Sequence, residues 1–420
     1  MSSSELLTGP ARPGARERSL WHHRDFRLLW GGQTVSLLGS RVTELALPLT
    51  AIVLLDATPA QLGLLNAAQY LPVLCVTLFA GVLADRVRRR PLLIGANLGR
   101  AAVLTVVPLL AWSQGLGVWA LCAVAFATGV LTAQFDVAYQ AYLPTLVSRE
   151  RLVEGNSKLQ GSRSVAETAG QGLGGALIQL LTAPVAILVD CLAYLFAAGT
   201  LLRIRAREER PARRAGRTSV RADIAEGLRV TLRSRLLRVI MLHASWYNLL
   251  WDVVLVVFPL YGIRVLGLGP AGLGMVVAAG SVGALGGSLA AARLGARLGT
   301  GRAMVLGMAL ASVATLLLPL APRSDAGLAV LVCGYVLNGC GIAVFNIHSI
   351  TLRQATVPDE LIGRVSATFR FVTWAVIPAG GLLGGLLATV LGPRAALFAT
   401  AVGLSAGAVV FLFSRTANRP

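Results

Sequence analysis

The sequence predicts an all-α membrane protein in which twelve transmembrane helices form two pseudo-symmetric bundles of six. Three observations predict this fold. Of 420 residues, 55% are hydrophobic and only 14% are charged, with a mean hydropathy of +0.70, which is too apolar for the surface of a soluble protein. Twelve apolar segments each reach the ~20 residues that a helix needs to cross a bilayer. The two halves of the chain also resemble each other.

The twelve predicted spans follow one another along the chain with short connections inside each half. In the first half they cover residues 28–54, 62–84, 92–113, 117–147, 158–182 and 184–204. In the second half they cover residues 237–262, 270–292, 302–322, 327–351, 364–391 and 393–414. The first apolar run is too long for the core of a signal peptide, so we expect it to stay in the membrane unprocessed.

A shift of 210 residues, half the chain, aligns the two halves. It brings FDVAYQAYLPTLVSRE, which starts at Phe135, over FNIHSITLRQATVPDE, which starts at Phe345. The same shift brings AGQGLGGAL over AGGLLGGLL and pairs Gly175 with Gly385. The sequence therefore predicts a duplicated six-helix bundle, an architecture in which transporters place a site at the interface between repeats.

The net charge of +19 follows the predicted topology. Of 38 basic residues 37 are arginine, and they crowd every second connection, which places both termini in the cytoplasm. Nucleic-acid binding is not expected, because the charge follows topology instead of one face. We expect a disordered cytoplasmic tail, a first bundle, a cytoplasmic linker, a second bundle and a short cytoplasmic tail at residues 1–27, 28–204, 205–236, 237–414 and 415–420.

The longest connection, residues 203–238, holds twelve arginines. Within it Ile224, Leu228, Leu232 and Leu236 recur every four residues and form one apolar stripe on an otherwise basic helix. Two interpretations stay open. The helix lies on the cytoplasmic leaflet with its arginines toward anionic headgroups, or the segment is a solvated linker with a short helix.

The stretch GVLADRVRRRP at residues 81–91 places an aspartate and a basic cluster directly behind an apolar run. It resembles the signature loop of the major facilitator superfamily. The stretches GQTVSLLGSRVTELALPL, YLPTLVSRERLVEGN, APVAILVDCLAYL and LRQATVPDELIGRV are similar to a branch of bacterial exporters. That branch includes siderophore (enterobactin-exporter-like), macrolide and other natural-product efflux proteins. The resemblance implies the superfamily fold and an efflux function.

The resemblance also implies a cytoplasmic gate formed by the signature loop. Asp85 would receive the exposed amides and the positive dipole end of the eleventh helix, which we expect to begin near Gly363 and Arg364. This bond would latch the two halves together. Gly81 belongs to the same motif, and its arginines would meet acids on neighbouring loops or lipid phosphates: Arg86, Arg88, Arg89 and Arg90.

The chain departs from the superfamily pattern at three positions. Arg88 stands where the family usually has a glycine, and Ala296 stands where the second repeat would place its aspartate. The predicted latch is therefore one-sided. In the fifth span AGQGLGG resembles the antiporter glycine motif, but Gln171 replaces its proline, and simple helix packing explains these glycines equally well.

Charged residues inside the predicted spans are candidates for function, because a charge at the bilayer centre costs about 2.5 to 3.5 kcal/mol on insertion scales. At ~1.5 Å per residue, Glu44 and Asp252 lie ~22 to 24 Å from the cytoplasmic ends of the first and seventh spans. Arg41 is one turn from Glu44, and Asn248 is one turn from Asp252. Glu44 either forms a structural pair with Arg41 or faces the cavity. Asp252 is the preferred proton carrier.

Further polar and aromatic candidates lie at other depths. Asp190 lies at a similar depth on the sixth span, where the superfamily's helices are scaffold, so we expect a structural hydrogen bond there and a second choice for the proton site. Tyr247 and Trp251 form an adjacent aromatic pair suited to flat or apolar substrates. Three residues could form a polar cluster beneath the cavity, although the histidine is more often structural: Asp136, His348 and Arg370.

No catalytic motif or phosphate-binding loop is present in the sequence, and the five cysteines form no CxxC pair. We expect buried apolar cysteines, no metal, no cofactor and no enzyme activity. The leading interpretation is a monomeric exporter of the inner (plasma) membrane whose partners are a small organic substrate, protons and lipids. The alternatives are uptake or a lipid-like substrate, and a membrane sensor or assembly subunit that transports nothing.

Overall fold

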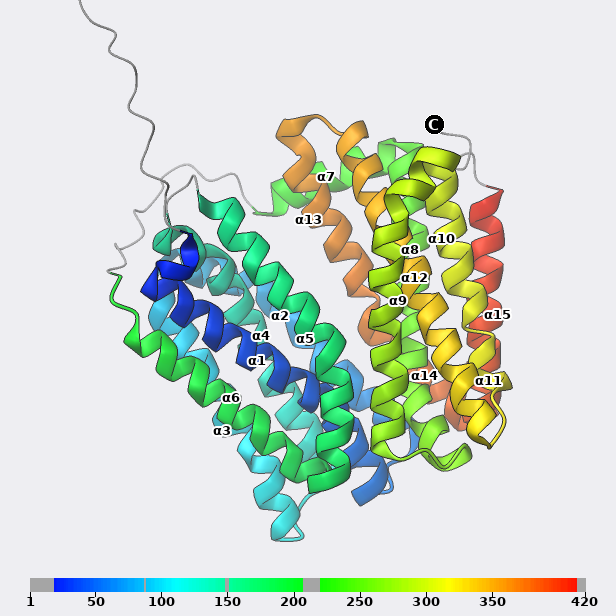
Figure 1. The fold of residues 1–420 in the computed structure, drawn as a ribbon, viewed down its shortest axis with the longest axis horizontal. Helices are drawn as coiled ribbons and strands as arrows, with labels where there is room; N and C mark the ends of the chain where they lie inside the picture. The colour runs from blue at the N-terminus through cyan, green and yellow to red at the C-terminus, as the bar shows by residue number, and fades with distance from the viewer. Residues whose placement is uncertain (1–18, 87, 148–150, 207–219, 414–420) are drawn as a thin grey trace, which may run out of the picture.

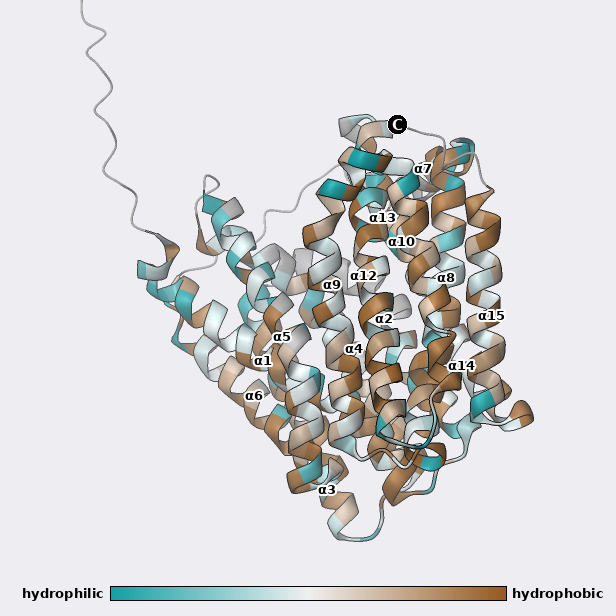
Figure 2. Ribbon diagram, turned by 45° about the vertical axis from the view of Figure 1, so that its right-hand side comes forward, coloured by the Kyte–Doolittle hydropathy of each residue, from teal (hydrophilic) through white to brown (hydrophobic). Residues whose placement is uncertain are grey.

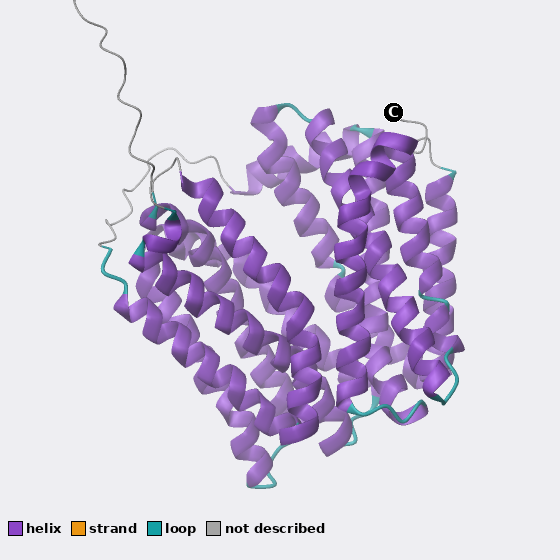
Figure 3. Ribbon diagram, in the orientation of Figure 1, coloured by secondary structure: helices purple, strands orange, loops and turns teal. Residues whose placement is uncertain are grey.

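The computed structural model describes residues 19–86, 88–147, 151–206 and 220–413. Within these ranges the description covers the backbone but not the side chains at some positions, which are 73–86, 140–141, 153, 164, 168, 220–225, 227 and 359–360. The described residues are almost entirely helical and contain no strand (Figure 3). This confirms the all-α class.

The helices of the first half match the predicted spans closely. They are η1 (Leu20–His22), α1 (Arg24–Leu49), η2 (Thr50–Leu54), α2 (Pro59–Arg86), α3 (Arg89–Trp112), α4 (Val118–Leu146), α5 (Leu152–Leu181) and α6 (Ala183–Arg203). The second half begins with α7 (Val220–Arg233), α8 (Arg235–Leu260), η4 (Tyr261–Val265) and α9 (Pro270–Leu298). It continues with α10 (Thr300–Ala314), α11 (Leu317–Leu320), α12 (Asp325–Thr356), α13 (Asp359–Ala375), α14 (Ile377–Leu391) and α15 (Pro393–Leu412).

Ten helical segments of the described chain are long and apolar enough to cross a membrane, among them the continuous pairs α10 with α11 and α13 with α14. The long helices α2 and α5 pack among them. Hydrophobic residues cover the middle of the helices, and hydrophilic residues gather toward their ends (Figure 2). Trp119 is 73% exposed and Leu180 is 80% exposed, which fits a surface that meets lipid instead of water.

The helices form two groups, α1 to α6 and α8 to α15, with α7 at one end beside α13 (Figure 1). Helices α1 and α8, the first of each group, both run directly into a π-helical turn, η2 and η4. The groups meet where α2 packs against α14 and where α5 packs against α9. We call the end that carries α7 the open end and the opposite end the closed end.

Glycine pairs bring the two groups together at the closed end. A Cβ added at Gly63 would lie 3.1 Å from the Gly385 Cα atom, and one added at Gly175 would lie 2.9 Å from the Gly274 Cα atom. Side chains at these positions would separate the helices. The 210-residue shift relates Gly175 to Gly385 and takes Gly63 to position 273, next to Gly274, so the two contacts, here called the glycine seams, occupy corresponding places in the repeat.

Helix α7 lies in the predicted linker, but the apolar stripe predicted there does not continue along one helix, and its contact with the cytoplasmic leaflet stays a prediction. Leu232 is 41% exposed, and Leu236 belongs to the next helix, α8. Val230 instead packs in an apolar cluster with residues of α13, such as Ile362 and Val365. The helix ends at Arg233 and turns before α8, which breaks the four-residue repeat.

The cysteines carry one further correction. Cys122 and Cys191 are buried as predicted, but Cys333 on α12 is exposed. Its helix face meets the lipid-facing surface, where a small apolar thiol needs no burial inside the protein. Cys75 lies among the side chains left aside.

Candidate functional site

A cavity of about 620 Å³ lies between α8, α10, α12 and α13, toward the open end. A cavity of this size suits a drug-sized organic molecule. Its lining combines aromatic, amide, hydroxyl and arginine side chains. The lining residues are Ala244, Tyr247, Asn248, Met308, Ile342, Phe345, Asn346, Ser349, Ile350, Arg353, Gly363, Ser366, Ala367, Phe369, Arg370, Thr373 and Trp374.

The predicted aromatic pair on α8 is present but lies deeper than expected. The rings of Tyr247 and Trp251 stack, with centroids 6.0 Å apart and planes 9° apart. Tyr247 lines the cavity but is only 3% exposed. Its hydroxyl accepts a 2.7 Å hydrogen bond from Asn338, which holds the ring inside the wall. Trp251 packs edge-on against Tyr335 and does not line the cavity. The pair therefore supports the cavity wall more than it forms the surface.

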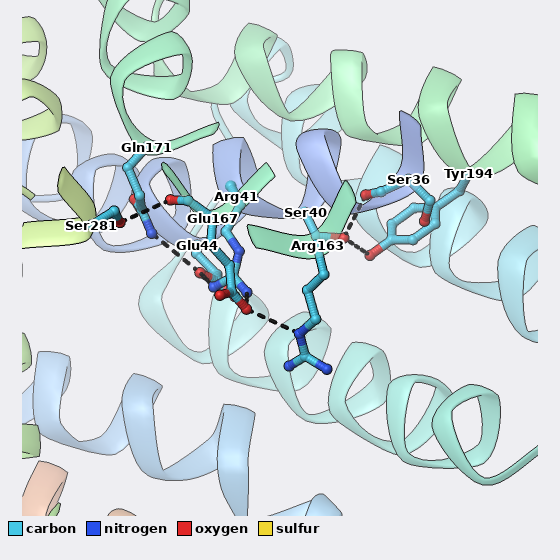
Figure 4. Close-up of polar contacts among 9 residues, drawn as sticks. All are labelled: Ser36, Ser40, Arg41, Glu44, Arg163, Glu167, Gln171, Tyr194 and Ser281. Carbon is cyan, nitrogen blue, oxygen red and sulfur yellow. Dashed lines mark hydrogen bonds and ion pairs between the residues drawn. The ribbon is translucent and has the colours of Figure 1, made fainter. Parts of the chain in front are cut away.

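Arg41 on α1 stands at the centre of an ionic network in the first half (Figure 4). Its guanidinium donates to Glu44 at 2.7 Å, as the spacing of the two residues predicts, and to Glu167 of α5 at 3.3 Å. Arg163 also binds Glu167, at 3.0 Å. Gln171 lies 3.4 Å from Glu44. We call these five residues the Arg41 network.

In the Arg41 network the positive charges of two arginines balance the negative charges of two glutamates. Sequence reasoning missed Glu167 and Arg163, because they come from α5. The signal was present in the chain as a pair of opposite charges at i and i+4 within a predicted span.

Asp252 on α8 is 3% exposed and takes its partner from the other half of the protein. Its Oδ1 atom lies 3.5 Å from the Asn66 side-chain nitrogen of α2, and its Oδ2 atom has no hydrogen-bond partner. Asn248, one turn from Asp252 on the same helix, donates to the Thr373 carbonyl at 2.9 Å. The Tyr70 hydroxyl of α2 interacts electrostatically with both Asp252 and Glu44.

Asp190 on α6 is fully buried inside the first half. Its Oδ2 atom accepts a 2.5 Å hydrogen bond from Thr43 of α1. Gly39 lets the helices approach here, since a Cβ at that position would lie 2.6 Å from Asp190 Oδ1. The contact joins α1 to α6 away from the cavity, which is the arrangement expected of a structural hydrogen bond.

Arg100 on α3 is a buried charge that sequence reasoning missed. It is 4% exposed, and its guanidinium carbon lies 4.3 Å from the Phe135 ring centroid and 4.2 Å from the Tyr194 ring centroid. Asn97, one turn before it, accepts a 2.5 Å hydrogen bond from the guanidinium. An asparagine and an arginine three residues apart in an apolar span were the available signal.

The comparison with known proteins decides the family. The sequence pattern of the family described as transmembrane secretion effector matches residues 19–419, which is nearly the whole chain. The chain belongs to this family, within the major facilitator superfamily. It is a membrane transporter and not an enzyme.

Relatives of this transporter include efflux proteins. Macrolide efflux protein A of Streptococcus pyogenes is 23% identical over 370 residues, which cover 87% of this chain and 90% of the relative. Multidrug efflux pump Tap of Mycobacterium tuberculosis (strain CDC 1551 / Oshkosh) is 27% identical over 365 residues, with 83% of each chain covered. The efflux activities in these names are those of the relatives.

Solved structures share the fold. The nucleoside transporter NupG matches with a TM-score of 0.76 at 10% identity, over 92% of this chain and 98% of that chain. A bacterial homologue of the iron transporter ferroportin, in an inward-facing state, matches with a TM-score of 0.73 at 17% identity, over 95% and 100%. The similarity confirms the major facilitator fold of this transporter.

The signature loop of the transporter is only partly described. The side chains of Gly81, Asp85 and Arg86 are among those left aside, so the latch stays a prediction. Arg90 donates to the Leu201 and Leu202 carbonyls at 2.9 and 2.8 Å, at the C-terminus of α6. These carbonyls are among those that the end of a helix leaves unpaired, and contacts of Arg90 with acids or lipid phosphates stay a prediction.

The expected start of the eleventh helix is displaced. α13 begins at Asp359, and Arg364 forms an ion pair with Glu226 of α7. The linker helix thus contacts the segment that the latch was predicted to bind.

The predicted cluster of Asp136, His348 and Arg370 does not form as a unit. His348 is 5% exposed and lies 3.1 Å from the Ala291 carbonyl of α9, a structural contact. Asp136 interacts electrostatically with Arg100 and Arg163 of its own half and, less strongly, with Arg370. His348 does not join Asp136 and Arg370 in one cluster, because its ring is held against α9.

Proposed function

We propose that this transporter exports small organic molecules across the plasma membrane by alternating access, driven by proton antiport. The supporting observation is the difference between its two ends. At the closed end the glycine seams hold the halves together, whereas the cavity lies toward the open end. Halves that are in contact at one end, with a cavity toward the other end, fit one state of an alternating-access cycle.

The open end is proposed to face the cytoplasm. The arginine-rich connections gather at this end. The positive-inside rule and the anionic lipids of the cytoplasmic leaflet both favour arginines on the cytoplasmic side. Residues 1–27 and 415–420 would then be cytoplasmic tails, with 205–236 as the linker between bundles 28–204 and 237–414. A cysteine placed at Ser219 should resist an impermeant thiol reagent applied outside intact cells, and labelling there would reverse the topology.

Asp252 is the proposed proton carrier. It is a buried carboxylate next to the inter-half boundary, and its hydrogen bond from Asn66 crosses that boundary. A movement of the halves would therefore change its surroundings directly. Glu44 is held by Arg41 and Gln171, which supports the interpretation of a compensated pair.

The function is tested by transport into inverted membrane vesicles that contain the protein and carry an imposed proton gradient. A panel of macrolides, other antibiotics and siderophores is added outside. We expect gradient-dependent accumulation of at least one compound, abolished by a protonophore and absent from vesicles without the protein. Accumulation only in right-side-out vesicles would indicate uptake. Failure of every compound to move in either orientation would contradict transport of these classes.

A further inference from the structure

The cavity wall carries arginines without compensating acids. Among the described residues that line it, the charged side chains are Arg353 of α12 and Arg370 of α13, and no carboxylate takes part. Neither arginine has a carboxylate within ion-pair distance in the described part of the chain. The Nε atom of Arg353 is buried and has no hydrogen-bond partner. A buried donor of this kind favours a ligand that supplies an acceptor.

Aromatic rings hold both guanidinium groups while leaving edge donors free. The Arg353 guanidinium carbon lies 4.0 Å from the Phe369 ring centroid, and that of Arg370 lies 5.9 Å from the Trp374 ring centroid. A ring contacts the flat face of a guanidinium, so the N–H groups at its edge can still bind a carboxylate in two parallel hydrogen bonds. Phe345 and Tyr247 add two further rings to the lining.

The facing half of the protein does not cancel this charge. In the Arg41 network, Arg41 and Arg163 compensate Glu44 and Glu167. Asp136 is a further carboxylate of that half, and it interacts with Arg100 and Arg163 of its own half as well as with Arg370. The surplus charge around the cavity is therefore positive.

We propose that the cavity binds organic carboxylates that carry a flat aromatic or conjugated ring. The carboxylate lies between Arg353 and Arg370, and the ring lies against Phe369 and Trp374. This inference rests on the proposed function for its role in transport, but the binding preference stands on the cavity alone. A preference for carboxylates distinguishes this cavity from a site that selects cationic drugs.

The test is a matched ligand series bound to the purified full chain in lipid nanodiscs. The radiolabelled probes are 2-naphthoate, 2-naphthamide and 2-naphthylmethylamine, which share a ring and differ in charge, with empty nanodiscs as the partition control. We expect 2-naphthoate to bind about 10- to 100-fold more tightly than the amide, the range for charge-assisted hydrogen bonds. The amine should bind most weakly. Equal affinities, or a preference for the amine, overturn the proposal.

Variants identify the groups responsible. Arg353→Gln with Arg370→Gln should equalise 2-naphthoate and 2-naphthamide, while Arg293→Gln, at an exposed arginine on α9 outside the cavity lining, should keep the preference. Arg353→Lys with Arg370→Lys keeps the charges and should retain part of it. Retention of the full preference in the double glutamine variant also overturns the proposal. If that variant does not fold, the ligand series on the unaltered chain still decides.

Failure of this inference differs from failure of the proposed function. Export of a neutral or cationic compound with no preference for 2-naphthoate in binding would remove the inference alone. Selective binding of 2-naphthoate without gradient-dependent movement of any compound would remove the proposed function alone.

Discussion

Arg264 donates a 2.6 Å hydrogen bond to Asp56 and a second, of 2.9 Å, to the Ala57 carbonyl. Arg264 lies in η4 behind α8, and Asp56 follows η2 behind α1. The ion pair therefore joins equivalent helix ends of the two repeats across the closed end. It lies beside the glycine seams and adds a directed polar contact to them.

Replacement of Arg264 should loosen the closed end. In Arg264→Gln the ion pair is lost, and because Asp56 is exposed the loss is worth about 0.2–1 kcal/mol. We expect up to a fivefold shift toward open conformations at this end. Spin labels at Ser113 and Ser324, in a cysteine-free background, would report it as a longer distance. Arg323→Gln is the control, and an identical shift in that variant would contradict a specific role for Arg264.

A larger residue at a glycine seam should have a stronger effect. A Cβ at Gly385 would lie 2.7 Å from the Pro59 carbonyl oxygen, so Gly385→Val should disfavour the closed seam by about 1–3 kcal/mol. The cavity should then spend less time open at the α7 end. We expect slower alkylation of a cysteine at the cavity residue Ser366 in inverted vesicles. Gly286→Ala, where a Cβ meets nothing within 4 Å, should leave the alkylation rate unchanged.

Neutralisation of Asp252 should uncouple transport from protons. Asp252→Asn keeps the size of the side chain, so we expect downhill substrate exchange to continue while uphill accumulation is lost. Glu44→Gln should instead weaken binding or folding, because Arg41 loses a partner at 2.7 Å. Accumulation and exchange are measured in the same vesicles, with Asp325→Asn as the control. If Asp252→Asn still accumulates substrate with unchanged pH dependence, the proton site lies elsewhere, and Asp190 is next.

The ion pair between Glu226 and Arg364 should restrain the cavity wall. Glu226→Gln removes the charge that holds α7 to α13, the helix that carries Arg370. Since both groups are partly exposed, we expect an effect of about 0.2–1 kcal/mol, seen as faster hydrogen exchange in the first turns of α13. Arg229→Gln, on the same helix, should leave exchange there unchanged. If hydrogen exchange in these turns is the same in both variants, α7 does not restrain α13.

Acid should release the segment before α1 from the start of α5. The Glu154 carboxylate accepts hydrogen bonds from Lys158 at 2.7 Å and from the Leu20 amide at 2.9 Å. The Lys158 bond first, and then the Leu20 amide, lower the pKa of Glu154 from 4.5 to about 2. Because the folded-state pKa is lowered, the stabilisation is present above pH 4.5 and is lost as the pH falls toward 2.

Proteolysis of residues 19–23 should therefore accelerate between these two pH values in the unaltered protein. An acid-active protease is used, with cleavage followed by mass spectrometry. In Glu154→Gln the segment should already be cleaved faster than in the unaltered protein at pH 4.5, with little further change on acidification. A pH response that survives this substitution would assign the contact to another group.

Local signals in the sequence account for what could be predicted. Apolar runs predicted the span Pro393–Leu412 almost to the residue, because membrane crossing depends on composition and length alone. The pair of Arg41 and Glu44 was also predictable, since three residues on one helix fix the spacing. Asn66 with Asp252 and Arg264 with Asp56 join residues about half the chain apart. No periodicity indicates such partners, because they depend on how the bundles dock.

The two glycine seams have a consequence for the origin of the fold. Each half contributes one glycine to each contact, Gly63 and Gly175 from the first, Gly274 and Gly385 from the second. Two separate copies of a single six-helix chain, related by a two-fold axis, would form the same pair of contacts from one surface patch. In such an ancestral dimer one mutation would have changed both contacts at once. In a single chain that contains both halves, a mutation changes one contact and leaves the other as it was.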